Sequence, residues 1–368
     1  MRIGILGGSF DPIHIGHVAL AKTAMAELKL DRFDFMPTRN NPWKDVKNAP
    51  DDDRRAMILA ATKGLEGMDV EDYELHRPAE EKNYTIDTMR ALVAMHPEDT
   101  YYFLMGMDQA CAFHQWKNAE ELSQIVQLVA FNRGGYPEDD DNLDKYGFIK
   151  ISNPPVTASS TEIKNGNLSM LDQNVLRYIS AHGLYLDTMI KPRMKDKRWR
   201  HSCSVAQLCA DFAEANGLDR TQGYIAGILH DVAKDLDMDE AEKLMHTYYP
   251  DHADSPKPIW HQWTGAYVAE HEFLVEDKDV LKAIEDHTTA ATDITRLGKC
   301  LYCADKLDPL RGYDSSRQIA VCKEDIDEGF RNALADFYNF SKKKGRHIDP
   351  VFFDIYNIFV KGHEQTHG

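Results

Sequence analysis

One stretch near the start of the chain decides the fold of its first half: GGSFDPIHIGH, residues 7–17. It follows the apolar run Arg2–Leu6, which predicts a buried first strand, and it precedes the segment His17–Lys29, which predicts a helix. Glycines at this place let the backbone approach a ligand and aim N–H groups at it. The start of the helix adds a partial positive charge. The turn is therefore predicted to bind phosphate.

Two histidines, His14 and His17, stand three positions apart at the entrance of the predicted helix. At this spacing both can face one oxyanion, and imidazole suits a charge that develops transiently at the α-phosphate of a nucleotide. The simpler alternative is a glycine-rich turn with a capping histidine. The run is not the dinucleotide fingerprint G-x-G-x-x-G, which argues against an NAD dehydrogenase.

Outward from this turn, short apolar runs alternate with amphipathic segments up to about residue 185. This alternation predicts an α/β, doubly wound and mostly parallel sheet, with ligands at the carboxyl ends of its strands. The further strands are expected at 33–36, 101–105 and 127–131, and helices at 54–63 and 85–95.

The pattern changes after the basic segment 189–200, where apolar residues recur at helical spacing and no strand is expected. We therefore predict two domains, 1–188 and 189–368, the second all-α. The first helix of the second domain is expected to begin at His201, and others to cover 224–229, 263–273, 280–287 and 298–307.

The bulk composition restricts the partners. The 368 residues carry a net charge of −17, which disfavours binding a nucleic acid backbone but allows a small nucleotide. No apolar stretch is long enough to span a bilayer. The six cysteines show no paired framework, and no signal peptide is recognisable, so we expect a cytoplasmic protein.

The turn of residues 7–17 resembles the H-x-G-H signature of the nucleotidyltransferase superfamily, in the form found in bacterial nicotinate-mononucleotide adenylyltransferases. Further segments resemble that family's motifs: YTIDT at 84–88, GMD at 106–108 with Trp116, and SSTEI at 159–163. The resemblance implies transfer of AMP from ATP, with its Mg²⁺, to nicotinate mononucleotide, which gives deamido-NAD and pyrophosphate.

The resemblance also implies roles for residues. His14, His17 and Lys44 would be catalytic. Where the family has arginine after the serine-rich motif, this chain has Lys164, which keeps the charge but loses bidentate geometry. The implied ATP site comprises Gly7, Gly8, Ser9, Phe10, His14, His17, Ser159, Ser160, Thr161 and Lys164, and the implied mononucleotide site comprises Asp11, Thr85, Asp87, Gly106, Asp108 and Trp116.

In the second half, histidine and aspartate recur at the ends or within the predicted helices. Because such residues converge from five helical segments, they can bind two divalent metals, with Asp231 as the natural bridge. A lone His-Asp pair at a helix end would be weak evidence. The set is His201, His230, Asp231, His261, His287 and Asp305.

This order resembles the HD phosphohydrolase superfamily, and the neighbouring motifs resemble its branch that splits diadenosine tetraphosphate symmetrically into two ADP. The resemblance implies one metal held by His201, His230, Asp231 and Asp305, and another held by Asp231, His261 and His287. Iron is the leading expectation, with manganese, zinc or cobalt as alternatives. Asp231 and Lys234 would be catalytic, and Lys234 and Arg311 would contact phosphate.

Three alternatives stay open for the second half. It could be a general nucleotidase, a guanosine-polyphosphate hydrolase, or a module that senses a nucleotide and regulates the first half. A pure sensor has no need of a full two-metal site, which favours an enzyme.

Overall fold

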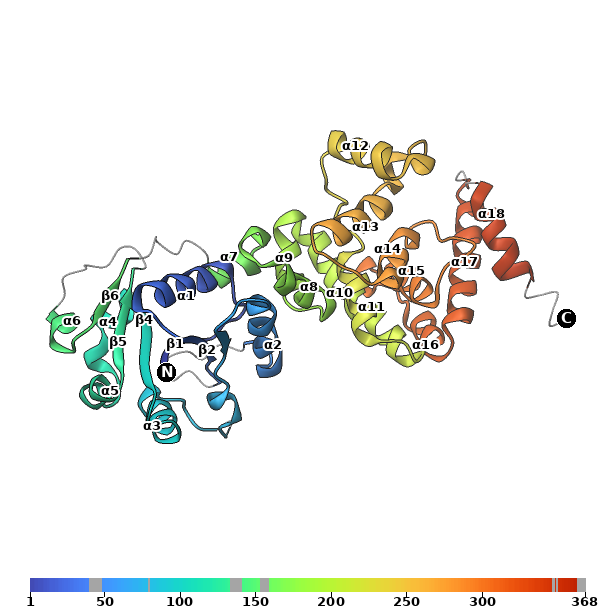
Figure 1. Ribbon diagram of the computed structural model, residues 1–368. Coiled ribbons are helices and arrows are strands. Elements are labelled where there is room, and N and C mark those ends of the chain that lie inside the picture. Colours follow the sequence, from blue (N-terminus) through green and yellow to red (C-terminus); the bar gives the residue numbers. More distant parts are fainter. Residues whose placement is uncertain are drawn as a thin grey trace. The chain divides into compact units, whose positions relative to one another are not determined.

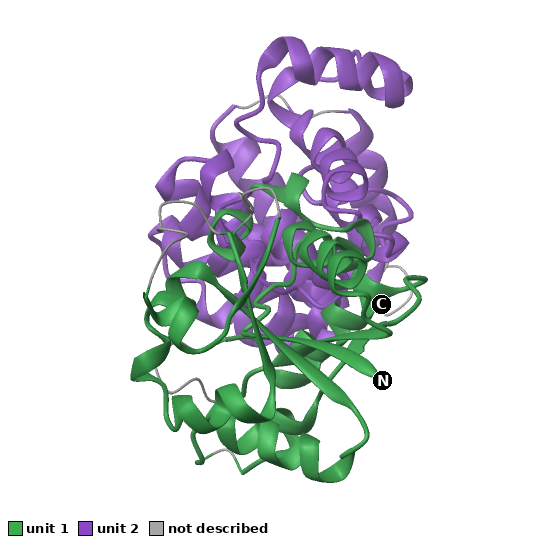
Figure 2. Cartoon of the chain, turned by 60° about the vertical axis from the view of Figure 1, so that its left-hand side comes forward, with its two compact units in different colours: residues 1–163, 167–178 green, residues 164–166, 179–368 purple. Residues whose placement is uncertain are grey.

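The computed structural model describes residues 1–39, 48–78, 80–132, 141–152, 159–345, 348 and 350–362. The chain forms two compact units, shown in green and purple in Figure 2. The first comprises residues 1–163 and 167–178, and the second comprises residues 164–166 and 179–368. A domain boundary after residue 188 remains our prediction.

The first unit contains a six-stranded parallel sheet of order β3-β2-β1-β4-β5-β6 (Figure 1). The central strand β1 (Arg2–Gly8) pairs with β2 (Arg32–Pro37) on one side and with β4 (Thr100–Gly106) on the other. The order of the strands therefore reverses between β1 and β4. In such sheets ligands bind at the carboxyl ends of the strands beside this reversal. The predicted doubly wound α/β fold is confirmed.

Side chains alternate between the two faces of β1, as they do in any strand. Ile3 and Ile5 belong to one buried cluster with Met89 of α3 (Thr85–Met95) and Leu122 of α5 (Ala119–Ile125). The remaining elements of this unit are α1 (Ile15–Leu28), α2 (Asp51–Thr62), β3 (Met68–Val70), α4 (Met107–Cys111), β5 (Gln127–Phe131), α6 (Asp141–Lys145), β6 (Ile149–Ile151), α7 (Ser160–Lys164, whose last residue falls in the second unit) and α8 (Gln173–Ala181, which continues into the second unit).

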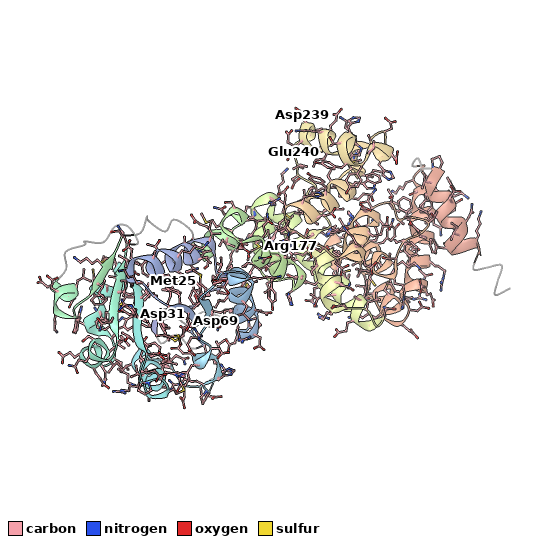
Figure 3. All side chains as sticks on the ribbon, in the orientation of Figure 1. Met25, Asp31, Asp69, Arg177, Asp239 and Glu240 are labelled. Atoms are coloured by element: carbon pink, nitrogen blue, oxygen red, sulfur yellow. The ribbon has the colours of Figure 1, made fainter. Side chains whose placement is uncertain are left out.

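The described residues of the second unit form helices joined by turns and loops, with no strand, as predicted. Helix α12 (Met238–Tyr248) illustrates how its helices begin: Asp237 caps it by accepting from the backbone N–H groups of Asp239 and Glu240, which Figure 3 labels. The others are α9 (Leu186–Ile190), α10 (Asp196–Ala215), α11 (Arg220–Leu229), α13 (His261–His271), α14 (Lys278–Asp286), α15 (Arg296–Leu307), α16 (Ser316–Glu324), α17 (Ile326–Lys343) and α18 (Pro350–Tyr356), with short 3-10 turns between them.

Glycine lets α10 and α11 pack closely. A Cβ added to Gly227 would lie 2.5 Å from Ala206 Cα, and one added to Gly223 would lie 2.8 Å from Cys209 O. No side chain fits at such distances, so only glycine permits this approach. The contact brings His201 of α10 and His230, which follows α11 directly, to a ring separation of 5.3 Å.

One predicted helix start was wrong. Helix α10 begins at Asp196, so His201 lies inside it. The end of the basic segment 189–200 forms the start of this helix, where the exposed Arg200 pairs with Asp196 at 2.9 Å. In the described part of the chain, no helix is both long and apolar enough to cross a membrane.

Candidate active sites

The glycine-rich turn lies at the carboxyl end of β1. Its two histidines stack, with ring centroids 3.7 Å apart, and the backbone N–H of His14 donates to Nδ1 of His17 at 3.3 Å. The ring of Phe10 meets His17 edge-on at 5.1 Å. The residue that follows β2 is hydrogen-bonded to the start of this turn, since Thr38 N–H donates to Gly8 O at 2.9 Å. The structure thus brings both predicted histidines to the edge of the sheet where ligands bind.

A buried arginine supports this turn, although no sequence motif singled it out. Arg54 of α2 is 1% exposed. Its Nη1 donates to Ser9 O at 2.8 Å and its Nε to Ala49 O at 3.3 Å, while Nη2 pairs with Asp51 Oδ1 at 2.5 Å. Ala49 N–H in turn donates to Asp11 Oδ1 at 3.0 Å. The start of α2 is therefore hydrogen-bonded to the glycine-rich turn.

The serine-rich motif reaches the turn through one hydroxyl. Ser160 Oγ donates to Pro12 O at 2.9 Å, whereas Ser159 Oγ accepts from the backbone N–H of Glu162. Thr161 is exposed. Lys164 belongs to the second unit, where its Nζ lies 4.8 Å from the ring centroid of Tyr185. Lys44 lies outside the described residues.

Four of the residues predicted to hold the mononucleotide come from α3, from the end of β4 and from α4, whereas Asp11 lies in the glycine-rich turn and Trp116 follows a 3-10 turn. Thr85 is the first residue of α3, Gly106 is the last of β4, and Asp108 lies in the first turn of α4. Asp87 pairs with Lys117 at 2.8 Å and with Arg90 at 3.2 Å, so its carboxylate is engaged within the protein.

Trp116 packs against two aromatic rings and remains half-buried. Its centroid lies 5.5 Å from that of Phe113 and 6.1 Å from that of Phe103. Adjacent to it in the chain, Lys117 places its Nζ 4.4 Å above the ring of Tyr84. Trp116 is thus supported by the core from one side while part of it stays accessible.

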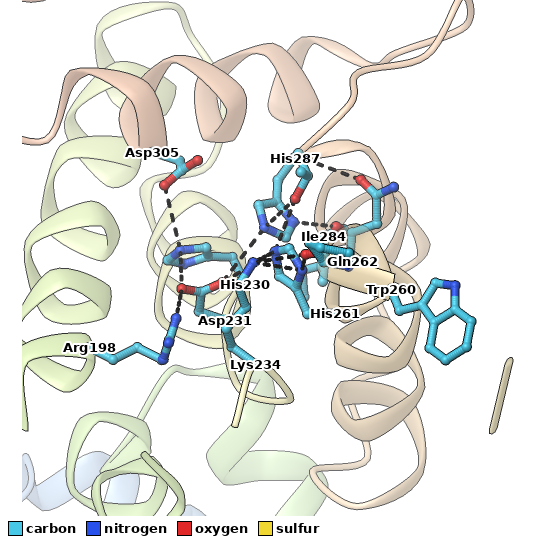
Figure 4. A network of polar contacts seen from close by, with 12 residues as sticks. Arg198, His230, Asp231, Lys234, Trp260, His261, Gln262, Ile284, His287 and Asp305 are labelled. Carbon is cyan, nitrogen blue, oxygen red and sulfur yellow. Dashed lines mark hydrogen bonds and ion pairs between the residues drawn. The ribbon is translucent and has the colours of Figure 1, made fainter. Parts of the chain in front are cut away.

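The second unit gathers the six predicted metal ligands at one place, and Figure 4 shows five of them. His230 and Asp231 follow α11 directly, His261 begins α13, and His287 follows α14. His201 comes from α10 and Asp305 from α15. Two groups of three bring their ligand atoms within 4.8 Å of one another: His201, His230 and Asp305, and His230, Asp231 and His287.

The two oxygens of Asp231 face different histidines. Its Oδ2 lies 3.8 Å from Nε2 of His230, whereas its Oδ1 lies 3.5 Å from Nε2 of His261 and 4.0 Å from Nε2 of His287. On the Oδ2 side, Asp305 Oδ1 lies 3.1 Å from Nε2 of His201 and 4.0 Å from that of His230. A carboxylate placed in this way can bridge two cations.

Three of the four histidines, His230, His261 and His287, are held in the form that binds metals. A carbonyl oxygen can only accept, so the Nδ1 atoms of His230 and His287, 2.6 and 2.7 Å from backbone carbonyls, carry the hydrogen and leave Nε2 as an acceptor. Burial lowers the pKa of His261 to about 3 and that of His287 well below its ordinary value. These rings are therefore neutral at pH 7.

Four cationic side chains surround the two carboxylates. Lys234 Nζ lies 2.8 Å from His261, and Arg311 Nη2 pairs with Asp305 Oδ1 at 2.5 Å. Arg198 pairs with Asp231 Oδ2 at 3.1 Å, and Lys306 pairs with Asp305 Oδ2 at 2.9 Å. The sequence pointed to Lys234 and Arg311 alone. Arg198 and Lys306 were missed because basic residues on a helix are usually exposed.

The donor set fits divalent metals. Neutral imidazole and carboxylate suit several transition metals. Nε2 of His230 is fully buried and has no hydrogen-bond partner among the described residues, although a buried polar atom without a partner is costly. A metal ion would satisfy it.

Comparison with known families agrees with both sites. A model of the cytidylyltransferase-like family matches residues 5–166, and a model of the HD domain matches residues 198–310. An HD domain implies the binding of divalent metal. The ranges contain the glycine-rich turn and all six predicted metal ligands, respectively.

Relatives match either the whole chain or its first half. A Mycoplasma pneumoniae protein described as a "probable nicotinate-nucleotide adenylyltransferase/Ap4A hydrolase" is 29% identical over 90% of this chain and 97% of its own length. A "probable nicotinate-nucleotide adenylyltransferase" of Listeria monocytogenes is 35% identical over 50% of this chain and 97% of its own. One from Halalkalibacterium halodurans is 38% identical over 50% of this chain and 91% of its own. This chain belongs to the nicotinate-nucleotide adenylyltransferase family and carries an HD domain that follows its nucleotidyltransferase domain in the sequence.

Proposed function

We propose that the first unit transfers the adenylyl group of ATP to nicotinate mononucleotide and releases pyrophosphate and deamido-NAD. The observation that carries this proposal is the stacked pair His14 and His17 at the carboxyl end of β1, in a chain whose relatives bear that activity in their names. A phosphate oxygen of the mononucleotide attacks the α-phosphorus of ATP, and the bond to the pyrophosphate oxygen breaks. Such a reaction depends on positioning and charge neutralisation.

The residues would divide this work between the two substrates. Backbone N–H groups of the turn and the imidazoles of His14 and His17 would stabilise the charge that grows on the α-phosphate. Lys44, Ser159, Ser160, Thr161 and Lys164 would bind the triphosphate, which brings its own Mg²⁺. The exposed face of Trp116 would stack on the pyridine ring, with Thr85 as a hydrogen-bond partner and Asp108 on the ribose.

We propose that the second unit hydrolyses diadenosine tetraphosphate to two ADP. Two divalent metals, with iron as our first choice, would activate a water and neutralise phosphate charge. The proposal is supported by the opposed oxygens of Asp231 and by a relative with the Ap4A hydrolase name that aligns with nearly the whole chain. Water attacks a phosphorus next to the central bridging oxygen, whose bond then breaks to release the two products.

The cations around the carboxylates would bind the phosphate chain. In the structure Arg198 pairs with Asp231, Lys306 and Arg311 pair with Asp305, and Lys234 contacts the neutral ring of His261. These four cations would turn to phosphate oxygens once metals neutralise the carboxylates. We further propose a cytoplasmic location and no nucleic-acid partner, in keeping with the nucleotide substrates.

One preparation of the full chain tests both activities. Nicotinate mononucleotide and MgATP should yield pyrophosphate and deamido-NAD, and nicotinamide mononucleotide should be offered in parallel. Diadenosine tetraphosphate with Fe²⁺, Mn²⁺, Zn²⁺ or Co²⁺ should yield ADP as its sole nucleotide product. AMP with ATP as products, or cleavage of guanosine polyphosphates instead, would refute the second assignment. Nucleotide binding without turnover would indicate a sensing module.

A further inference from the structure

The four histidines of the proposed metal site differ in the group that their Nδ1 atom contacts. Nδ1 faces a backbone carbonyl in three of them: Gly227 O for His230, Ile284 O for His287 and Pro258 O for His261, the last at 3.0 Å. In His201, Nδ1 faces a carboxylate instead, Oδ2 of Asp308, at 2.6 Å. One metal position of the two therefore contains a ligand supported by a negative charge.

Burial and hydrogen bonds fix the position of the Asp308 side chain. It is 1% exposed, and its second oxygen accepts from Ser204 Oγ at 2.5 Å and from Leu310 N–H at 3.1 Å. It lies behind His201, whose other nitrogen, Nε2, faces the predicted ligand Asp305. Asp308 is thus not placed as a metal ligand itself.

A carboxylate that accepts from an imidazole N–H does two things for the opposite nitrogen. It fixes the ring in the tautomer whose Nε2 is free to bind, and it makes that nitrogen more basic than a neutral carbonyl would. Loss of such a partner weakens metal binding by roughly 10- to 100-fold in other proteins.

We propose that Asp308 is a positioning residue for His201, and that it makes the metal position of His201, His230, Asp231 and Asp305 the tighter of the two. The inference rests on the two-metal site proposed above. The position formed by Asp231, His261 and His287 has only carbonyl support, so it should release its metal first.

Calorimetric titration of the metal-free full chain with Mn²⁺ tests this inference. The wild-type chain should bind two equivalents with different affinities. Asp308→Asn removes the charge and leaves a single acceptor oxygen for the two sides that the carboxylate serves, His201 Nδ1 and Leu310 N–H. It should weaken the tighter equivalent about 10- to 100-fold and leave the other nearly unchanged. Ser204→Ala should weaken the same equivalent less.

Asp325→Asn provides a matched control. Asp325 also caps a helix of this unit, accepting from the backbone N–H groups of Asp327 and Glu328, but it contacts none of the ligands. It should leave both equivalents unchanged. If Asp308→Asn bound both equivalents as the wild type does, or weakened only the looser one, the inference would be wrong while the metal site stood. A wild-type chain that bound no Mn²⁺, Fe²⁺ or Zn²⁺ would overturn the site and the inference together.

Discussion

Replacement of Arg54 by methionine tests whether the glycine-rich turn depends on the buried arginine that supports it. The methionine side chain fills much of the same space but cannot donate to Ser9 O or to Ala49 O. Each carbonyl left unsatisfied costs about 1–3 kcal/mol, whereas Asp51 is about one-third exposed and can be rehydrated. With two such carbonyls, we therefore expect a loss of about 2–6 kcal/mol in the stability of the first unit.

The turn should also become misplaced. A shift of about 1 Å at a reacting group can cost about 10²-fold in rate, so kcat for pyrophosphate release should fall about 10- to 100-fold. Arg54→Lys, which keeps one donor, should lose less.

The neighbouring residue supplies the control. Arg55 is 44% exposed and pairs with Asp72 at 3.1 Å, an arrangement worth about 0–1 kcal/mol. Arg55→Met should therefore keep wild-type kcat, and diadenosine tetraphosphate cleavage should stay normal in both variants. A folded Arg54→Met chain with unchanged kcat for adenylyl transfer would refute the reasoning.

Three other perturbations have defined outcomes. His17→Ala should slow pyrophosphate release about 10²-fold or more through loss of a transition-state donor, and an unchanged rate would remove His17 from the mechanism. Burial raises the pKa of Glu74 to about 7, above its ordinary value, so its contribution to stability is full below about pH 4.5 and is lost as pH rises to about 7. The free energy of unfolding should therefore be measured with urea at pH 5 and at pH 8 for the wild type and for Glu74→Gln. From the lower to the higher pH, the free energy of unfolding of Glu74→Gln should rise relative to that of the wild type by up to about 3 kcal/mol; a difference that does not change with pH would contradict this. Gly227→Ala should lower the free energy of unfolding of the second unit by about 1–3 kcal/mol and weaken metal binding, because its Cβ would lie 2.5 Å from backbone. Gly265→Ala, whose Cβ would have its nearest contact at 3.3 Å, should lose less stability. Equal losses in the two variants would mean that the close approach of α10 and α11 is not critical.

The elements with a strong apolar pattern could be predicted from the sequence. β1, β2, β4 and β5 lie where apolar runs predicted strands, and the six metal-ligand candidates come together as expected. The edge strands β3 and β6 were missed because three residues, as in Met68–Val70 and Ile149–Ile151, are too few to show alternation.

The supporting charges were beyond the reach of the sequence. Arg54, Asp308 and Arg198 look like ordinary surface residues of helices or turns, and their partners lie at sequence distances of 45, 107 and 33 residues. Only the folded chain shows that they are buried or half-buried against a site. Helix α10 begins before His201, which the sequence did not indicate because its first residues, Asp196 to Arg198, are all charged and show no apolar periodicity.

The most direct test of the two-metal site is metal content and ADP release in Asp231→Asn. A carboxylate binds two cations through separate oxygens, whereas a neutral amide bridges poorly, and Asp231 places Oδ2 toward His230 and Oδ1 toward His261. The variant should lose most of its bound metal and stop releasing ADP from diadenosine tetraphosphate, while adenylyl transfer to nicotinate mononucleotide continues at the wild-type rate. If elemental analysis found two metals per chain and ADP still formed, Asp231 would not be the bridge, and the two-metal account of the second unit would be wrong.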